Sequence, residues 1–402
     1  MEIILYIVIA LLIIIAWVLI DFSLGRKNHL KNLRKKEFPK RNSDFTLYTD
    51  GNKLYEDLFD EMKNASNHIH TFFYMVNDDH VSEEYFTILK NKADEGVEVR
   101  LLMDYLGSHK VKKKKVEELR SHGITAEFCQ KPSFPYLFFS INQRNHRKIT
   151  VIDGKIGYLG GFNIGKEYLG QDPKFGVWRD YHLKFTGEGV QDLQTQFFEN
   201  WTEANPGTSQ DYQLPNYYPP LAKGKSRHQL VPTNGRFLED TFQGLIRRAQ
   251  KSIIICTPYF IPNDELFDEL LQALNRGVKV TILLPEKADH ILVRDAAFLY
   301  FPALLKAGAD VHFFYLGFYH AKVMVIDEEM CDIGTANFDK RSLYLNNELN
   351  CLIFDPEFVQ SLIPAIQKDI HNAEKLTYEF INERSIFDKG KEQVARLVAP
   401  LL

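Results

Sequence analysis

The sequence predicts an α/β protein of two similar domains that face each other, preceded by one N-terminal transmembrane helix. Three observations predict this architecture. Residues 3–20 form an uncharged apolar run, apolar β-branched runs alternate with helix-like stretches, and a His-x-Lys-x4-Asp pattern occurs once in each half of the chain. Such alternation is typical of parallel strands joined by helices, so we expect α/β/α layers with mostly parallel sheets. The composition, 45% apolar and 25% charged, is that of a globular protein.

Residues 3–20, IILYIVIALLIIIAWVLI, form the predicted membrane anchor. A helix of this length spans about 27 Å, close to the hydrocarbon thickness of a bilayer. A cleaved signal peptide is the alternative. However, no basic residue precedes the run and no small-x-small cleavage site follows it. We therefore expect an uncleaved, single-pass anchor at residues 1–20.

A basic segment follows the anchor. Residues 26–41 contain eight Lys or Arg and one acidic residue, Glu37. The positive-inside rule then places the N-terminus outside and the rest of the chain in the cytoplasm, against the inner leaflet. The cluster could also bind anionic headgroups, or it could be a topology signal alone. In both cases lipid is the substrate class to test first, and we assign residues 21–45 to a juxtamembrane linker.

The rest of the chain is a duplication. In each half an amphipathic run leads into an apolar segment, HIHTFFYMVND or SIIICTPYFIPND, and then into a helix-like stretch that ends at a glycine. These glycines, Gly96 and Gly277, suit helix C-caps just before a strand. A repeat this long is typical of two similar domains and not of a solenoid.

A stretch rich in Pro, Gly, Asn and Ser separates the two copies, and it has no apolar period. We assign the first domain to residues 46–202, the linker to 203–228 and the second domain to 229–402.

Charge and cysteine usage exclude some classes of protein. A net charge of -4 and a pI near 6.4 argue against a protein that coats nucleic acid, so we expect no nucleic-acid partner. The chain has no CxxC pair, and its four cysteines are widely spaced. We expect them to be reduced and mostly buried. They are Cys129, Cys256, Cys331 and Cys351.

Each half contains His-x-Lys-x4-Asp, followed by glycine and asparagine. The residues are His146, Lys148, Asp153 and Asn163 in the first half, and His320, Lys322, Asp327 and Asn337 in the second. A histidine and a lysine two positions apart on a strand point to the same face, so both can contact one phosphate. The aspartate, which we count with the histidine and lysine among the expected catalytic residues, lies at the strand end, where it can anchor the turn. A lone histidine is more often a core residue, but a matching second copy favours a functional site.

Two such motifs, brought together, suffice for a double displacement at phosphorus. One imidazole attacks and gives a phosphohistidine, while the other donates a proton to the leaving alkoxide and later accepts one from the acceptor hydroxyl. Lys148, Lys322, Asn163 and Asn337 would bind the non-bridging oxygens. Zinc is a weaker interpretation because HxK replaces HxH and no cysteine or carboxylate cluster completes a site. We expect no metal and no other cofactor.

These residues resemble the duplicated HKD motif of the phospholipase D superfamily. From about residue 45 to the end, the chain is similar to bacterial cardiolipin synthases. The supporting segments are FFYMVND, TPYFIPND, GGFNIGKEYLG, VWRDYHLKFTG, TANFDKRS with NNELN, and ARLVAPLL. The resemblance implies two phospholipase D-like domains in a bacterial cell membrane, whose motifs meet in one metal-free site.

The resemblance also implies roles for individual residues. By analogy His146 is the nucleophile and His320 the general acid/base, although the nearly symmetric sequence leaves this order open. Glu348 would orient His146 and Asp180 would orient His320, each from the opposite half. Ordinary surface pairing is the alternative for both carboxylates.

The reaction that the resemblance implies is phosphatidyl transfer between two phosphatidylglycerol molecules, giving cardiolipin and glycerol. The better-known cardiolipin synthases carry two N-terminal hydrophobic segments and this chain has one, so the acceptor alcohol stays open, as does a major or minor role. A hydrolase that releases phosphatidic acid is the main alternative. The acidic balance and the anchor disfavour a nuclease, and the intact motifs disfavour a non-catalytic scaffold. The aromatic stretch FPYLFF (134–139) suits either a lipid-binding surface or the core, and the oligomeric state stays open.

Overall fold

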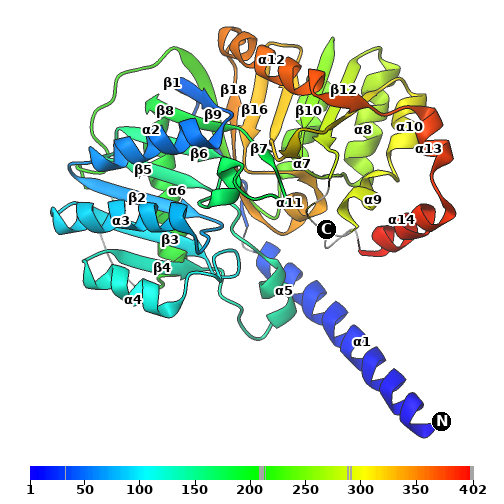
Figure 1. Cartoon of the computed structure of the whole chain (residues 1–402), viewed down its shortest axis with the longest axis horizontal. Coiled ribbons are helices and arrows are strands. Elements are labelled where there is room, and N and C mark those ends of the chain that lie inside the picture. Colours follow the sequence, from blue (N-terminus) through cyan, green and yellow to red (C-terminus); the bar gives the residue numbers. More distant parts are fainter. Residues whose placement is uncertain (32, 208–211, 213, 288, 290–291, 399–402) are drawn as a thin grey trace.

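The structure is a computed structural model that describes residues 1–31, 33–207, 212, 214–287, 289 and 292–398 (Figure 1). The last four residues of the ARLVAPLL segment and part of the segment expected to link the domains lie outside the described residues.

The first half begins with a long helix and continues with alternating strands and helices. Its elements are α1 (Glu2–Leu30), β1 (Arg41–Tyr48), α2 (Gly51–Lys63), β2 (His68–Phe73), α3 (His80–Asp94), β3 (Glu98–Asp104), α4 (Lys113–Ser121), β4 (Thr125–Cys129), α5 (Leu137–Asn142), β5 (Ile149–Ile152), β6 (Ile156–Gly160), the 3-10 helix η1 (Lys166–Leu169), β7 (Val177–Arg179), β8 (His182–Gly187) and α6 (Gly189–Ala204).

The second half repeats this order and adds two C-terminal helices. Its elements are β9 (Ser226–Asn234), α7 (Leu238–Arg248), β10 (Ser252–Cys256), β11 (Phe260–Ile261), α8 (Asp264–Asn275), β12 (Lys279–Pro285), α9 (Val293–Ala297), α10 (Phe301–Lys306), β13 (Asp310–Phe314), β14 (Gly317–Tyr319), β15 (Val323–Ile326), β16 (Met330–Gly334), β17 (Phe338–Asp339), α11 (Lys340–Tyr344), β18 (Asn347–Ile353), α12 (Pro356–His371), β19 (Ala373–Lys375), α13 (Tyr378–Glu383) and α14 (Ile386–Val398).

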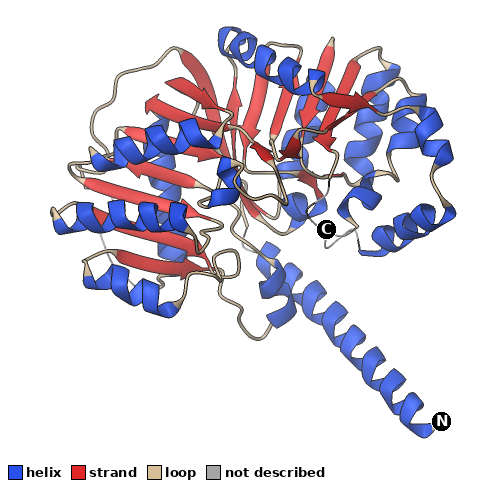
Figure 2. Cartoon of the chain, in the orientation of Figure 1, coloured by secondary structure: helices blue, strands red, loops and turns tan. Residues whose placement is uncertain are grey.

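The two halves share one sheet (Figure 2). Within the described residues its strand order is β19-β13-β12-β10-β15-β16-β18-β9-β1-β8-β6-β5-β2-β3-β4. Reading outward from the β1–β9 pair, six strands follow in the same order on each side, with β19 added at the outer edge of the second half, which confirms the duplication. Helices cover both faces, with α2, α3, α7 and α8 on one side and α6 and α12 on the other. The α/β/α prediction is therefore confirmed.

The strand pairing differs from the prediction of mostly parallel sheets. In the large sheet only β2–β3–β4 and β10–β12–β13 pair in parallel, whereas the strands between β2 and β10 pair antiparallel, so the sheet is mixed. The reason is local. Each motif strand, β5 or β15, returns through a turn of three residues into β6 or β16, and so short a turn joins only antiparallel strands.

The predicted helix ends are confirmed. Gly96 has φ +89° and Gly277 has φ +85°, and each lies just after a helix and just before a strand of the sheet. Glycine adopts this left-handed conformation without the clash that a Cβ would cause, so the helix can stop and the chain can enter the sheet.

Helix α1 is one continuous helix that extends beyond the predicted anchor. It is the one described helix long and apolar enough to cross a membrane, with a mean hydropathy of 3.4 over its most apolar window and none of that window buried. It runs on to Leu30, so the first part of the expected linker is helical, and β1 begins at Arg41 inside the same segment.

The end of α1 docks on the FPYLFF segment. The Asp21 carboxylate accepts the backbone N–H of Phe139 at 2.8 Å. At Gly25 an added Cβ would lie 2.5 Å from the Cβ of Phe139, so only glycine allows this approach. His29 continues the contact through Gln143, at 2.9 Å. The aromatic stretch is therefore the docking site for the end of α1, while Phe134, at 80% exposure, projects into solvent.

The basic segment after the anchor is divided between two roles. Lys36 pairs with Glu199 at 2.5 Å and Arg41 with Asp192 at 3.1 Å, so these cations tie the segment to α6. The side chains of Lys27 and Lys31 remain exposed at the end of α1. Arg34, Lys35 and Lys40 are exposed as well, so a large part of the segment's charge faces solvent.

Candidate active site

Backbone pairing between the two halves positions both motif histidines. The N–H of His146 donates to the carbonyl of Asn347 at 2.9 Å, and the N–H of Asn347 donates to Arg144 at 2.9 Å. In the other half the N–H of His320 donates to Arg179 at 2.7 Å, where β14 and β7 pair in parallel. Each histidine is therefore held by a strand segment of the opposite half.

Each histidine also binds a carboxylate of the opposite half. Nδ1 of His146 lies 3.0 and 3.1 Å from the two oxygens of Glu348, and Nδ1 of His320 lies 2.6 Å from Asp180. These are the pairs that the resemblance implied. An ionised carboxylate can only accept, so Nδ1 donates, and in the neutral ring the lone pair is then on Nε2. Nε2 is thus the atom of each ring that is able to attack phosphorus or to accept a proton.

Both motif lysines turn back toward their own histidine. The Lys148 ammonium donates to the carbonyl of His146 at 2.7 Å, and Lys322 donates to that of His320. Lys322 also lies 2.6 Å from Nδ1 of His320 and 3.6 Å from Asp180. Since Nδ1 cannot donate to Asp180 and accept from Lys322 at once, we take the Asp180 bond as the persistent one and assign the lysine proton to the carbonyl.

Burial and neighbouring charges set the protonation states. Burial lowers the pKa of His146 and lowers that of His320 to about 4, so both imidazoles are neutral near pH 7. Burial also lowers the pKa of Lys322 to about 8, against the opposing effect of Asp180. Burial also lowers the pKa of Lys148 well below its usual range.

Charges from the two halves act on one another. Burial alone would raise the pKa of Asp180 and Glu348, but the neighbouring lysines and histidines lower both. The charge of Lys322 lowers the pKa of His146, and Glu348 raises that of Lys322. Such coupling requires proximity, so the structure brings the two His-Lys pairs and both carboxylates into one buried cluster.

The motif aspartates lie elsewhere. Asp153 and Asp327 follow β5 and β15, at the strand ends remote from the histidines. Asp153 accepts the backbone N–H groups of residues 66–68, and Asp327 accepts those of residues 250–252, at 2.6–3.0 Å. Both anchor the start of the neighbouring strand, and neither makes a described contact with the His-Lys pairs.

The motif asparagines are engaged with the protein itself. Asn163 accepts the N–H of Met75 at 3.0 Å and donates to the hydroxyl of Tyr168 at 2.9 Å. Asn337 donates to Asp339 at 3.0 Å, while its Oδ1 is buried without a hydrogen-bond partner. Both side chains brace the loops after β6 and β16. An amide N–H reaches a phosphate oxygen only if these bonds rearrange.

Comparison with known proteins identifies the family. The family described as "Cardiolipin synthase, PLD-like domain" matches residues 58–201 and 243–370, and each matched segment contains one motif. The minor cardiolipin synthase ClsB of Bacillus subtilis (strain 168) is 40% identical over 402 residues, which is 100% of both chains. This chain belongs to the cardiolipin synthase family.

Other members are nearly as similar. The major cardiolipin synthase ClsA of Bacillus subtilis (strain 168) is 39% identical over 89% of this chain and 75% of its own length. Among solved structures, the phosphatidylserine synthase of Haemophilus influenzae Rd KW20 superimposes with a TM-score of 0.67 at 16% identity. It covers 94% of this chain and 100% of its own, and at that identity it shows the fold alone.

In this family member, three further side chains bind the carboxylate of Glu348. They are Thr335 at 2.6 Å, Ser342 at 3.0 Å and Asn346 at 3.2 Å. Two aromatic rings enclose the histidines: Tyr74 lies 5.0 Å from His146 and Trp178 lies 5.0 Å from His320, between ring centroids. The sequence segments TANFDKRS, NNELN, FFYMVND and VWRDYHLKFTG contain them, but no spacing in the sequence assigned them a role.

Proposed function

We propose that this chain is a cardiolipin synthase that transfers a phosphatidyl group from one phosphatidylglycerol to another and releases glycerol. One observation carries the proposal: two buried histidines, one from each half, each bound through Nδ1 to a carboxylate of the other half. Membership of a family of cardiolipin synthases supports the substrate class.

In the first step Nε2 of His146 attacks the phosphorus of a phosphatidylglycerol. The bond from phosphorus to the glycerol headgroup breaks, His320 protonates the departing alkoxide, and a phosphatidyl-histidine remains. His320 must be protonated to act, although burial lowers its pKa. The bound phosphodiester brings a negative charge close to His320. This charge raises the pKa of His320 and favours its protonated form, which is the form that can donate a proton.

In the second step a hydroxyl of another phosphatidylglycerol displaces His146. His320, now neutral, accepts the hydroxyl proton as the new phosphorus–oxygen bond forms and the phosphorus–nitrogen bond breaks. The products are cardiolipin and a restored enzyme. Lys148 and Lys322 bind the non-bridging oxygens and stabilise their charge in both transition states. The order of the two histidines rests on the family resemblance.

We further propose that α1 spans the bacterial cell membrane once and holds the catalytic halves on the cytoplasmic side. The exposed apolar surface of α1 and the basic residues at its end support this topology. The docked end of α1 would keep the site against the inner leaflet, where phosphatidylglycerol and other anionic lipids are its partners.

A product assay tests the function. The purified full chain, incubated with phosphatidylglycerol vesicles alone, is expected to form cardiolipin and glycerol in equal amounts. Phosphatidic acid without cardiolipin would indicate hydrolysis by water in the second step, and the absence of any product would refute the assignment. Acid-labile, base-stable phosphate on the protein, absent in His146→Ala, would report the covalent intermediate.

A further inference from the structure

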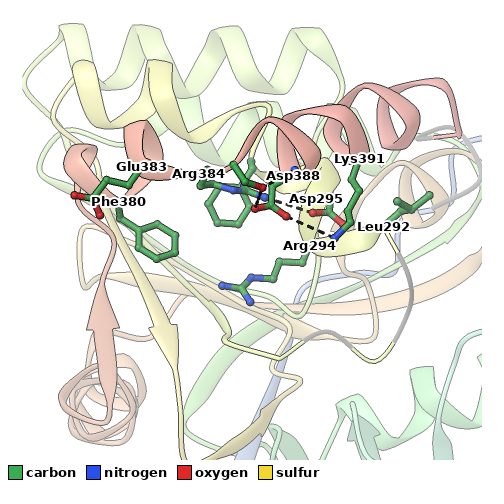
Figure 3. Close-up of a pocket in the computed structure, with 10 residues that line it drawn as sticks. Leu292, Arg294, Asp295, Phe380, Glu383, Arg384, Asp388 and Lys391 are labelled. Atoms are coloured by element: carbon green, nitrogen blue, oxygen red, sulfur yellow. Dashed lines mark hydrogen bonds and ion pairs between the residues drawn. The ribbon is translucent and has the colours of Figure 1, made fainter.

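A second binding feature lies in the second half, away from the motif residues. Helices α9, α13 and α14 enclose a cavity of about 900 Å³ (Figure 3). Neither the motif residues nor Asp180 and Glu348 line it. The duplication does not explain it, since the two C-terminal helices that form one wall have no counterpart in the first half.

Most charges in this cavity are paired. Arg384 contacts Asp295 at 3.4 Å and Glu392 at 3.1 Å, and Lys391 contacts Asp388 at 3.5 Å. The Arg384–Asp295 pair joins the α13–α14 junction to α9, whereas the Lys391–Asp388 pair lies within α14 (Figure 3).

Two charged side chains of the cavity form no ion pair with any described residue. Glu383 is exposed, whereas Arg294 is partly buried and its Nε has no hydrogen-bond partner among the described residues. Its guanidinium stacks over Phe298 and Phe313, 5.7 and 5.3 Å from the ring centroids. Figure 3 shows it pointing away from the paired group. A partly buried cation without a counter-ion is costly, and a planar guanidinium binds two phosphate oxygens at once.

The other walls and the surroundings are apolar. Phe298 and Phe380 line the cavity, and the outer surface beside it exposes Phe387 at 80% and Val394 at 51%. In Figure 1, α14 lies on the side of the body from which α1 departs. An arginine in a cavity next to exposed apolar side chains, on the side of the membrane helix, suits a lipid better than a soluble anion.

We propose that this cavity binds the anionic phosphodiester headgroup of a bilayer lipid, with Arg294 on the phosphate and Phe380 against the glycerol and upper acyl chain. This site is separate from the motif cluster and performs no chemistry. The proposal depends on the proposed membrane attachment but not on the proposed transfer reaction.

Photo-crosslinking with peptide mapping tests it. The full chain is reconstituted in vesicles that contain phosphatidylglycerol with a diazirine near its headgroup, and crosslinked peptides are mapped by mass spectrometry. Labelling of the α9 and α13–α14 peptides is expected, and Arg294→Gln should lower it about tenfold, the loss expected for a charge-assisted hydrogen bond. Labelling near His146 serves as the internal reference and should not change.

Two further variants keep the test decisive. Phe380→Ser, at a half-exposed position, should also lower labelling without disturbing the core. Lys306→Gln removes an exposed cation of the same half outside the cavity and should have no effect.

The proposal is overturned if Arg294→Gln and Phe380→Ser both leave C-terminal labelling unchanged. It is also overturned if millimolar inorganic phosphate abolishes that labelling, because the site would then bind a soluble anion. Because the readout does not require turnover, a failed product assay would leave this test intact.

Discussion

Glu348 and Asp180 bind equivalent histidines, yet their surroundings differ. The Glu348 carboxylate is held by neutral donors besides His146, namely Thr335, Ser342 and Asn346. Asp180 has the backbone N–H of Tyr181 at 2.8 Å and the ammonium of Lys322 at 3.6 Å. The first histidine thus has a carboxylate fixed by hydroxyl and amide groups, and the second has one balanced by a cation.

Part of the difference arises at one position of the repeat. Thr335 follows Gly334 in the second copy, and Gly161 follows Gly160 in the first. The Thr335 hydroxyl donates to Glu348, whereas at Gly161 a Cβ would lie 2.0 Å from an oxygen of Asp180. A duplicated sequence has therefore diverged where the two halves need different carboxylate neighbours, which is expected if the histidines have different tasks.

The largest effect is expected from the histidines themselves. His146→Ala and His320→Ala should each lower turnover by at least about 10⁴-fold, because nucleophile and proton carrier act as a unit. For the same reason the double variant should be no worse than either single one. The rate of cardiolipin formation measures the turnover of each variant. If the loss in the double variant equalled the product of the two single losses, the two histidines would act independently and not in one site.

Replacing either carboxylate by an amide should cause the next largest loss of activity. Asp180→Asn is expected to lower kcat about 10³-fold and Glu348→Gln about 10²-fold, since an amide can present N–H to Nδ1 and favour the wrong tautomer. The loss should be smaller for Glu348 because three other side chains hold its replacement in place. Equal losses in kcat would contradict the comparison, and thermal unfolding would check that both variants fold.

Gly161→Ala tests the close packing of the backbone at residue 161 against the Asp180 carboxylate. The added methyl must displace the Asp180 carboxylate, and a misplacement of about 1 Å costs up to about 10²-fold in rate. Gly244→Ala is the control, because a Cβ there meets no atom within 4 Å. If Gly161→Ala kept full activity, close packing against Asp180 would not matter for turnover.

Thr335→Val tests the hydrogen bonds that hold the Glu348 carboxylate. It removes the hydroxyl bound to Glu348 at nearly constant shape, and the loss of a hydrogen bond to a charged group should lower kcat about tenfold. Thr335→Ser restores the hydroxyl and should restore most of the rate. A KM effect without a change in kcat would instead place Thr335 in substrate binding.

The smallest effect near neutrality should come from pH. With a pKa of about 8, Lys322 is charged below pH 8 and neutral above it, so kcat/KM should be halved near pH 8 and continue to fall. His320, the proton donor of the first step, has a pKa of about 4 in the free enzyme, so its own break in the profile lies below pH 5, well separated from that of Lys322. Lys322→Arg should move the alkaline limb upward because guanidinium stays charged. An unmoved limb in an active Lys322→Arg would assign it to another group.

Local patterns in the sequence were enough to predict the two motif strands, the duplicated order of the elements and the glycines that end helices, because each of these depends on neighbouring residues. The pairs Glu348–His146 and Asp180–His320 join residues far apart in the chain, so only the family resemblance indicated them. Three features gave no sequence signal: the antiparallel centre of the sheet, the hydroxyl and amide contacts of Glu348, and the docking of α1 on Phe139. Each depends on tertiary packing that no periodicity records.

Helix α1 is continuous from Glu2 to Leu30, so its length fixes the distance between its two ends. Because Asp21 and Gly25 pack against the segment of α5, the end of α1 is fixed close to the residues that lead to His146. Each residue inserted between Ile20 and Asp21 would move the catalytic body about 1.5 Å along the helix axis. Under the proposed topology, the length of α1 therefore sets the distance between the motif histidines and the membrane surface.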